Sequence, residues 1–269
     1  MELTKATDIF LKHYNLWTKN SKVKQIKDYN NHKIRHSIWV LEYGRLILLK
    51  MWDNISEELK TKSQTCFILH DIARFYQNNW KKVLANNVFE HWDAGYNLAK
   101  KDWYSAEICL AIKYHNKKDI LKFYEEKEYK NFSIEEKKEA EFLVKITRDA
   151  DKLENMLYMV FDTKHILLLD KENEWDQKKE FISKWLLKDI LWKKIVEREN
   201  IKTKTDKILA MVSWIFDINF YETKKNLKQN KFLKKIWKIL EENLHKEDKK
   251  NLEKILDICK KELKNKSNS

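Results

Sequence analysis

Proline is absent from this sequence of 269 residues, and glycine occurs only twice. These two residues usually form the turns and tight hairpins that connect β-strands, so a chain almost without them is a poor candidate for a sheet protein. Hydrophobic residues make up 43% of the chain, which is enough to bury a core. We therefore predict an all-α fold in which amphipathic helices pack into a bundle.

Cysteine is scarce as well. The three cysteines, Cys66, Cys109 and Cys259, are odd in number and far apart, which is typical of reduced thiols and not of a disulfide framework or a zinc ribbon. The amphipathic N-terminal segment carries Glu2 and Asp8 and lacks the apolar centre of a signal peptide. No apolar run approaches the roughly 20 residues of a membrane span. We expect a cytoplasmic protein with no membrane among its partners.

Arginine is also scarce, because only five of the 55 basic residues are arginines and the others are lysines. The net charge of +13 would suit an anionic partner such as a nucleotide, a nucleic acid or a membrane surface. General richness in lysine is a simpler explanation of this charge than a nucleic-acid interface. A small phosphorylated molecule is therefore the favoured partner, and nucleic acid a less favoured one.

A histidine and an aspartate are adjacent at the end of the apolar run Cys66–Leu69. Neighbouring residues lie about 100° apart on a helix, so His70 and Asp71 can reach the same cation. One such pair is a weak signal, because it also occurs as a capped or surface pair. The signal gains weight from further ligand-type residues, one on each surrounding helix and each in an apolar context where an unpartnered polar group is costly: His36, His91, His115 and Asp151.

Hydrophobic spacing predicts the helices of the first half of the chain. We expect a first helix over residues 4–19, a polar connection over 20–33 and a long helix over 31–52. A buried stripe of this long helix begins at His36. His32, one turn earlier, is expected to be a cap or a rim residue.

Capping residues predict where the next helices begin. Ser56 is expected to cap the helix that carries His70, and Asp102 the helix over 103–115. Two pairs with the spacing of a capping box open two more helices: Asn87 with Glu90, and Ser133 with Glu136.

The last part of the chain predicts four more helices, separated by polar turns near residues 171, 200, 224 and 246. Its tryptophans, Trp185 and Trp192 among them, recur at helical intervals and are expected in the core. We predict a core over residues 1–160 and a helical extension over 161–269 that belongs to the same compact domain.

The ligand-type residues comprise four imidazoles and two carboxylates. Nitrogen and oxygen ligands without a thiolate suit iron, manganese, cobalt or magnesium better than a closed structural zinc site. Six side chains are too many for one catalytic ion that must keep positions open for water. They divide naturally between two ions if one aspartate bridges them. We predict one or two divalent metal ions as cofactors.

The sequence around these residues resembles the HD superfamily of metal-dependent phosphohydrolases. His36, His70-Asp71 and Asp151 lie in R-H-S-I-W-V, L-H-D-I-A-R-F and D-A-D-K-L, and the segments H-W-D-A-G-Y and A-I-K-Y-H-N look like those with the two further histidines of its dinuclear branch. The resemblance implies an HD-type helical bundle over roughly residues 30–160, with additional C-terminal helices packed on it. It also implies that one metal is held by His36, His70, Asp71 and Asp151, and that Asp71 bridges to a second held by His91 and His115.

The activity that the resemblance implies is hydrolysis of a small phosphate ester or anhydride, favourably a nucleotide, by a metal-activated hydroxide. Members with the GYP signature, which cleave cyclic dinucleotides, carry an additional histidine where this chain has Asn116. That difference argues against cyclic-di-GMP as the substrate. Two alternatives stay open: a mixed-valent di-iron oxygenase on the same scaffold, and a binding module that senses a nucleotide.

A phosphorylated substrate also needs positive charge beside the metals. Three of the five arginines lie next to the motifs, and a guanidinium suits phosphate geometry, although each could instead pair with a structural acid. We predict that Asp71, Arg74 and Arg148 act in catalysis. We further predict that the substrate is bound by Arg35, Arg74, Lys113, Asn116, Lys117, Arg148 and Lys152.

Overall fold

The computed structural model describes residues 2–19, 21–51, 55–76, 90–161, 180–241 and 243–266. Within these ranges the chain forms helices and no β-strand, apart from an isolated bridge between Glu180 and Leu244. The prediction of an all-α fold is confirmed. None of the described helices is long and apolar enough to cross a membrane.

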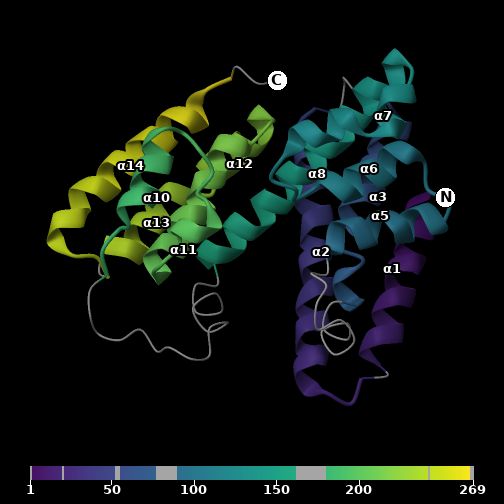
Figure 1. Cartoon of the computed structure of the whole chain (residues 1–269), viewed down its shortest axis with the longest axis horizontal. Coiled ribbons are helices and arrows are strands. Elements are labelled where there is room, and N and C mark those ends of the chain that lie inside the picture. The colour runs from purple at the N-terminus through teal and green to yellow at the C-terminus, as the bar shows by residue number, and fades with distance from the viewer. Residues whose placement is uncertain are drawn as a thin grey trace. The chain divides into compact units, whose positions relative to one another are not determined.

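The chain divides into two compact units, Met1–Asp151 and Lys152–Ser269, each of which is described by itself. The predicted domain boundary at residue 160, and the packing of the extension on the core, stay predictions. Helices α1, α2, α3, α5 and α6 pack together in the first unit (Figure 1). The helices of this unit, including α8 that continues beyond it, are α1 (Glu2–Thr18), α2 (Lys24–Lys50), α3 (Glu57–Leu69), α5 (His91–Lys101), α6 (Ala106–Tyr114), the 3₁₀ helix η2 (Ile120–Glu125), α7 (Lys127–Asn131) and α8 (Ile134–Phe161).

Helix α2 begins at Lys24, so the prediction that residues 20–33 form a connection is wrong for most of that segment. The first turns of α2 are polar and lack a hydrophobic stripe, but contacts with α1 hold them. The buried Asn30 side chain donates a hydrogen bond to Thr18 Oγ1 at 3.1 Å, and Tyr14 donates to Asn31 Oδ1 at 2.6 Å. The early start places Lys33 well inside the helix.

Two of the predicted helix starts are confirmed. Ser56 accepts a hydrogen bond from the backbone N–H of Leu59, and Ser133 and Glu136 make both bonds of a capping box. The prediction for Asp102 is wrong, because this residue ends α5 and Trp103 follows in a left-handed conformation with φ 62°. Asn87, the partner predicted for Glu90, lies outside the described residues.

The close approach of α2 and α3 depends on Gly44. A Cβ atom at this position would lie 2.3 Å from a ring atom of Phe67, whose side chain is fully buried. The absence of that atom lets the ring of Phe67 pack against the backbone of α2. The α2–α3 contact in turn brings His36 and His70 together.

The second unit contains more helices than predicted, within its described part. They are α10 (Lys184–Leu191), the 3₁₀ helix η3 (Arg198–Asn200), α11 (Lys204–Val212), the 3₁₀ helix η4 (Ser213–Asp217), α12 (Tyr221–Gln229), α13 (Phe232–Glu241) and α14 (Lys246–Lys264). The turn predicted near residue 224 is wrong, since α12 runs through it. The turn predicted near residue 171 lies outside the described part.

The prediction that Trp185 and Trp192 belong to the core is also wrong. Their exposed fractions are 64% and 66%, whereas Leu186 and Ile190 on the same helix are fully buried. Helical spacing shows that two residues share a face, but it does not show which face is covered. Here Lys188 lies beside both indole rings, at 5.2 and 5.6 Å from their centres.

Candidate metal centre

The buried end of α3 carries the His-Asp pair. Residues 66–69 are almost completely buried, and they bring His70, which has no exposed surface, and Asp71, which has 4%, into the interior of the first unit. His70 ends the helix, with its backbone N–H bonded to the carbonyl of Cys66. The chain turns directly after it, so the two side chains reach the same space from one helix end.

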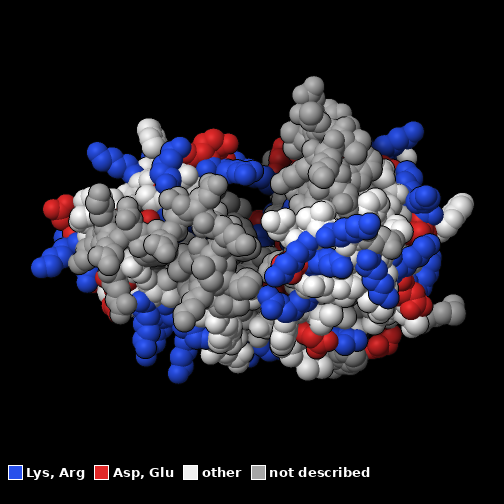
Figure 2. All heavy atoms as spheres, turned by 90° about the horizontal axis from the view of Figure 1, so that it is seen from below, with Lys and Arg blue, Asp and Glu red and all other residues white. Residues whose placement is uncertain are grey.

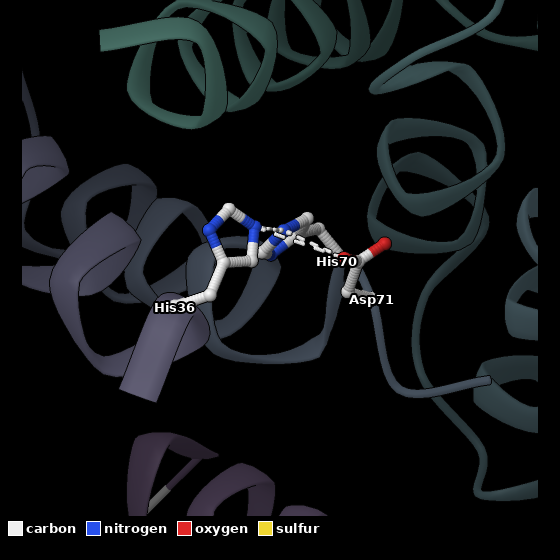
Figure 3. A group of neighbouring side chains, drawn as sticks. All are labelled: His36, His70 and Asp71. Carbon is white, nitrogen blue, oxygen red and sulfur yellow. Dashed lines mark hydrogen bonds and ion pairs between the residues drawn. The ribbon is translucent and has the colours of Figure 1, made fainter. Parts of the chain in front are cut away.

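His36 of α2 and Asp151 of α8 complete the first group of ligand-type residues. The Nε2 atoms of His36 and His70 are 3.1 Å apart, and His36 Nε2 lies 3.2 Å from Asp151 Oδ1. Figure 3 shows the His36 and His70 rings meeting tip to tip beside Asp71. His36, His70 and Asp71 are close enough to hold one metal ion.

The second group shares Asp71 with the first. The Oδ1 atom of Asp71 lies 3.5 Å from His91 Nε2 and 3.5 Å from His115 Nε2. His91 is the first residue of α5, and His115 directly follows α6. Gly95, one turn after His91, packs against Ile112 of α6 and lies near the carbonyl of His70, so this glycine lets α5 approach the centre closely. These three residues also form a group that could hold a metal ion.

Hydrogen bonds to backbone carbonyls orient two of the imidazoles. The Nδ1 atoms of His70 and His115 lie 2.8 Å from the carbonyl of Phe67 and 2.7 Å from that of Ile112. A carbonyl only accepts, so Nδ1 carries the proton and donates it in each ring. The Nε2 atoms therefore present lone pairs to the centre, which is the form in which histidine binds a metal.

The environment of these atoms fits a cation. His91 Nε2 is buried and has no hydrogen-bond partner in the described part of the chain. Leaving this nitrogen without a partner is costly in free energy, and a bound cation would supply one. Burial lowers the pKa of His70 to about 4 and that of His91 to about 2, so both rings are neutral ligands. A set of neutral imidazoles and carboxylates without thiolates suits a divalent ion of the iron or manganese type.

The two carboxylates are ionised. Burial alone would raise the pKa of Asp71, but the charges of Lys33 and Arg74 outweigh it and hold that pKa well below its usual value. For Asp151, burial alone would raise the pKa, but the hydrogen bond from His36 outweighs it and lowers that pKa. Both residues are therefore ready to bind a cation at neutral pH.

Lys33 is a residue of the centre that sequence reasoning missed. Its Nζ atom lies 2.9 Å from Asp71 Oδ2, the oxygen that faces His36. The signal was present, because Lys33 precedes His36 by three residues and so shares its helix face. It was hidden by the assignment of residues 20–33 to a connection. His32, which was considered instead, lies near Arg35, with 3.4 Å between His32 Nδ1 and Arg35 Nη2.

The predicted arginines occupy different positions. Arg74 lies at the centre, with Nε 3.3 Å from Asp71 Oδ1 and 21% of its side chain exposed. Arg148 is buried, and its Nη1 donates hydrogen bonds of 2.8 Å to the carbonyls of Tyr114 and Lys117. Arg148 thus holds the end of α6 and the segment that carries His115. A direct substrate contact by either arginine stays a prediction.

The other residues predicted to bind substrate are not gathered at the centre by any described contact. Arg35 and Asn116 are exposed. Lys113 pairs with Glu126 at 2.6 Å and Lys117 with Asp93 at 2.8 Å. Lys152, whose Nζ pairs with Asp217 at 2.8 Å, belongs to the second unit.

The first unit is helical in its described part, and it buries two groups of histidines around a shared aspartate, each of which could hold a metal ion. The family model described as HD domain matches residues 34–156, a range that contains all six ligand-type residues. This part of the chain is an HD domain, and HD domains are characteristic of the superfamily of metal-dependent phosphohydrolases. The chain matches no curated protein and no solved structure.

Proposed function

We propose that this protein hydrolyses a small phosphate ester or anhydride, with a nucleotide as the favoured substrate, at a centre of two divalent metal ions. One observation carries the proposal: the two oxygens of Asp71 face different pairs of histidines. Oδ2 lies 3.7 Å from His36 Nε2 and 3.8 Å from His70 Nε2. Oδ1 lies 3.5 Å from the Nε2 atoms of both His91 and His115. A carboxylate with this surrounding is suited to bridge two cations.

The first ion would be held by His36, His70, Asp71 and Asp151, and the second by Asp71, His91 and His115. When bound, such ions lower the pKa of water toward neutrality and neutralise negative charge on a phosphoryl group. The hydrogen bonds of His70 and His115 to backbone carbonyls keep both rings in the orientation that binding needs.

The charged side chains beside Asp71 support an anionic substrate. Lys33 and Arg74 are partly exposed, with side-chain exposures of 16% and 21%, so they connect the buried carboxylate with the accessible edge of the centre. Because a bound cation also neutralises Asp71, these two side chains would then be available for phosphoryl oxygens. Arg74 offers the planar donors that fit phosphate, and Lys33 adds a point charge.

The face drawn in Figure 2 gives less support to a nucleic-acid substrate. On the face drawn in Figure 2, Lys and Arg side chains are spread over both units, with Asp and Glu side chains between them. A nucleic-acid site usually gathers its basic residues along one face or helix.

Metal counting with an activity screen tests the proposal. Protein purified without oxygen is expected to contain about two metal ions per chain and to release phosphate from a panel of nucleotides and phosphate esters. His91→Ala and His115→Ala should each lower the content toward about one ion and reduce turnover by orders of magnitude. His245→Ala, which removes a histidine of the second unit that stacks on Phe181, is the matched control.

The same measurements contradict the proposal in two ways. Unchanged metal content with retained turnover in both variants would exclude the second ion. Oxygen consumption without phosphate release would instead indicate a di-iron oxygenase, which the same ligand set also suits.

A further inference from the structure

A cavity lies within the unit Lys152–Ser269, between α12, α13 and α14. Its volume is about 530 Å³, and none of its lining residues belongs to the metal centre. Cavities of ~300–1,000 Å³ with apolar walls and a few polar groups are typical of small-molecule sites. This cavity therefore has the size of a ligand site and lacks a role in the proposed reaction.

The interior of the cavity is apolar. Leu227, Phe232 and Leu263 form its buried lining, with at most 2% of each residue exposed. Trp237 and Leu256, which are half-buried, face it from α13 and α14. The long apolar strip between these two helices would suit an alkyl chain or a flat ring system.

Lysines surround one end of the cavity. Five exposed lysines line it, and no ion pair links any of them to an acidic side chain in the described part of the chain: Lys228, Lys231, Lys234, Lys260 and Lys264. They come from the end of α12, the start of α13 and the end of α14. The two acidic lining residues, Glu253 and Asp257, precede Lys260 on α14, and Asp257 pairs with Lys261 at 2.7 Å.

Helix dipoles explain only some of these lysines. Lys228, Lys260 and Lys264 lie in the last turns of their helices, where a cation is favourable. Lys231 and Lys234 lie at the start of α13, where the dipole disfavours a cation. An anion bound there would meet the free backbone N–H groups of α13 and the surrounding lysines together.

We propose that this cavity binds an anionic amphiphile, a small molecule with one apolar chain and a carboxylate or phosphate head. The chain lies between Trp237 and Leu256, and the head lies at the start of α13 among Lys231, Lys234 and Lys260. The apolar lining selects against free inorganic anions, and the lysines select against neutral or cationic amphiphiles. The ligand is a single free molecule, because a volume of about 530 Å³ is that of a small-molecule site.

Calorimetric titration of the full-length protein tests this site. Dodecanoate and dodecyl phosphate, each below its critical micelle concentration, are expected to bind with a stoichiometry of about one, because this cavity has the volume of a site for one small molecule. Dodecyltrimethylammonium and inorganic phosphate should each bind at least about tenfold more weakly, because each lacks one of the two recognised features.

Charge reversal separates the site from general basicity. Lys234→Glu combined with Lys260→Glu should weaken dodecanoate binding at least about tenfold. The matched control is Lys238→Glu with Lys254→Glu, which reverses two exposed lysines of α13 and α14 outside the cavity. It should change the affinity less than about twofold. Lys234→Glu places an acid in the first turn of α13, which favours the helix, and circular dichroism verifies the fold.

Three results would overturn the inference: no binding of either anionic amphiphile, equal loss of affinity in both double variants, or binding to anionic phospholipid vesicles without binding of the free amphiphiles. If charge reversal unfolds the chain, the pair Lys234→Gln and Lys260→Gln replaces it. That pair should still weaken dodecanoate binding more than the same change at Lys238 and Lys254.

Discussion

Asp71 is the residue on which the candidate centre depends. It is the only residue shared by the two groups that could hold a metal within the described part of the chain. Its carboxylate also contacts Lys33 and Arg74, so without metal two side-chain cations compensate its charge. A buried carboxylate without such partners would be strongly destabilising. In the proposed function, a bound metal ion would neutralise Asp71 and the two cations would face the substrate.

Replacement of Lys33 by Met tests this double role. The metal-free variant should lose about 2 kcal/mol of unfolding free energy, because one partner of the buried carboxylate is gone. Metal affinity should stay the same or rise, since Lys33 no longer competes for Asp71 Oδ2. Inhibition by inorganic phosphate should weaken about tenfold. Denaturant unfolding, metal titration and inhibition assays give the three values.

Lys24→Met provides the control, because this lysine is exposed at the start of the same helix. A metal affinity that falls by orders of magnitude in Lys33→Met, but not in the control, would show that Lys33 helps to shape the metal centre. It would then not be a substrate-binding residue.

Arg74 and Arg148 should behave differently when each is replaced by Met. The sequence predicts that both contact the substrate, in which case both variants keep their metal. The contacts in the structure lead us to expect this only for Arg74, with a raised KM. Arg148→Met removes the donor to the carbonyls of Tyr114 and Lys117, and so should loosen His115 and lower metal content. Metal analysis and steady-state kinetics of the two variants separate these outcomes.

At the scale of the element, the packing of α2 on α3 brings the first metal-type group together. Gly44 and Phe67 form the contact, and the carbonyl of Phe67 accepts the hydrogen bond that orients His70. The packing of two helices and the orientation of a ligand therefore depend on the same residue. A substitution at Gly44 should therefore change the orientation of His70, although Gly44 is not one of the ligand-type residues.

Gly44→Ala should destabilise the protein by about 1–2 kcal/mol. Alanine favours a helix by up to ~1 kcal/mol over glycine, but overpacking of a closed core costs ~1–3 kcal/mol. The overpacking term wins, because three atoms of the Phe67 ring lie within 2.6 Å of the added carbon. Denaturant unfolding measures the change, and metal affinity should also decrease.

The only other glycine of the chain is a matched control. In Gly95→Ala the new carbon would meet Ile112 Cγ2 at 3.0 Å and all other atoms at 3.9 Å or more, so a smaller loss is expected. Adding Phe67→Leu to Gly44→Ala should recover part of the stability. No recovery would contradict the proposed overlap with the ring.

At the scale of the whole molecule, the buried histidines make the metal-free protein sensitive to acid. The folded pKa of His70 is about 4, below its usual 6.5, so only the unfolded chain takes up this proton between these values. Stability is unaffected above pH 6.5 and falls as the pH decreases toward 4. His91, whose pKa is about 2, acts in the same direction. Asp71 and Asp151 have lowered pKa values, so their contribution is lost only below their usual value of 3.8.

Urea unfolding of the metal-free protein should therefore give a free energy lower at pH 5 than at pH 7.5 by about 4 kcal/mol, with about 2 kcal/mol from each of His70 and His91. His70→Asn should reduce this difference, because it removes one of the groups that titrate only in the unfolded state. A stability that rises toward pH 5 would show that the buried histidines are protonated in the folded protein.

The sequence predicted a large part of the fold and of the centre. Scarcity of proline and glycine excluded a sheet, and polar residues in apolar helical contexts identified the six ligand-type side chains. Capping by Ser56 and Ser133 was also predicted correctly. Each of these features depends on composition or on the residues that surround one position in the sequence, and the sequence therefore reveals it.

Tertiary structure alone decided the features that involve distant residues. Lys33 and Asp71 are 38 positions apart, and Arg148 lies 34 positions from the carbonyl that it holds. The extra turns of α2 are stabilised by α1, and the exposed tryptophans of α10 share their helix with the buried Leu186 and Ile190. Helical periodicity defines the faces of a helix, but the partner that covers each face is set by packing of segments far apart in the chain.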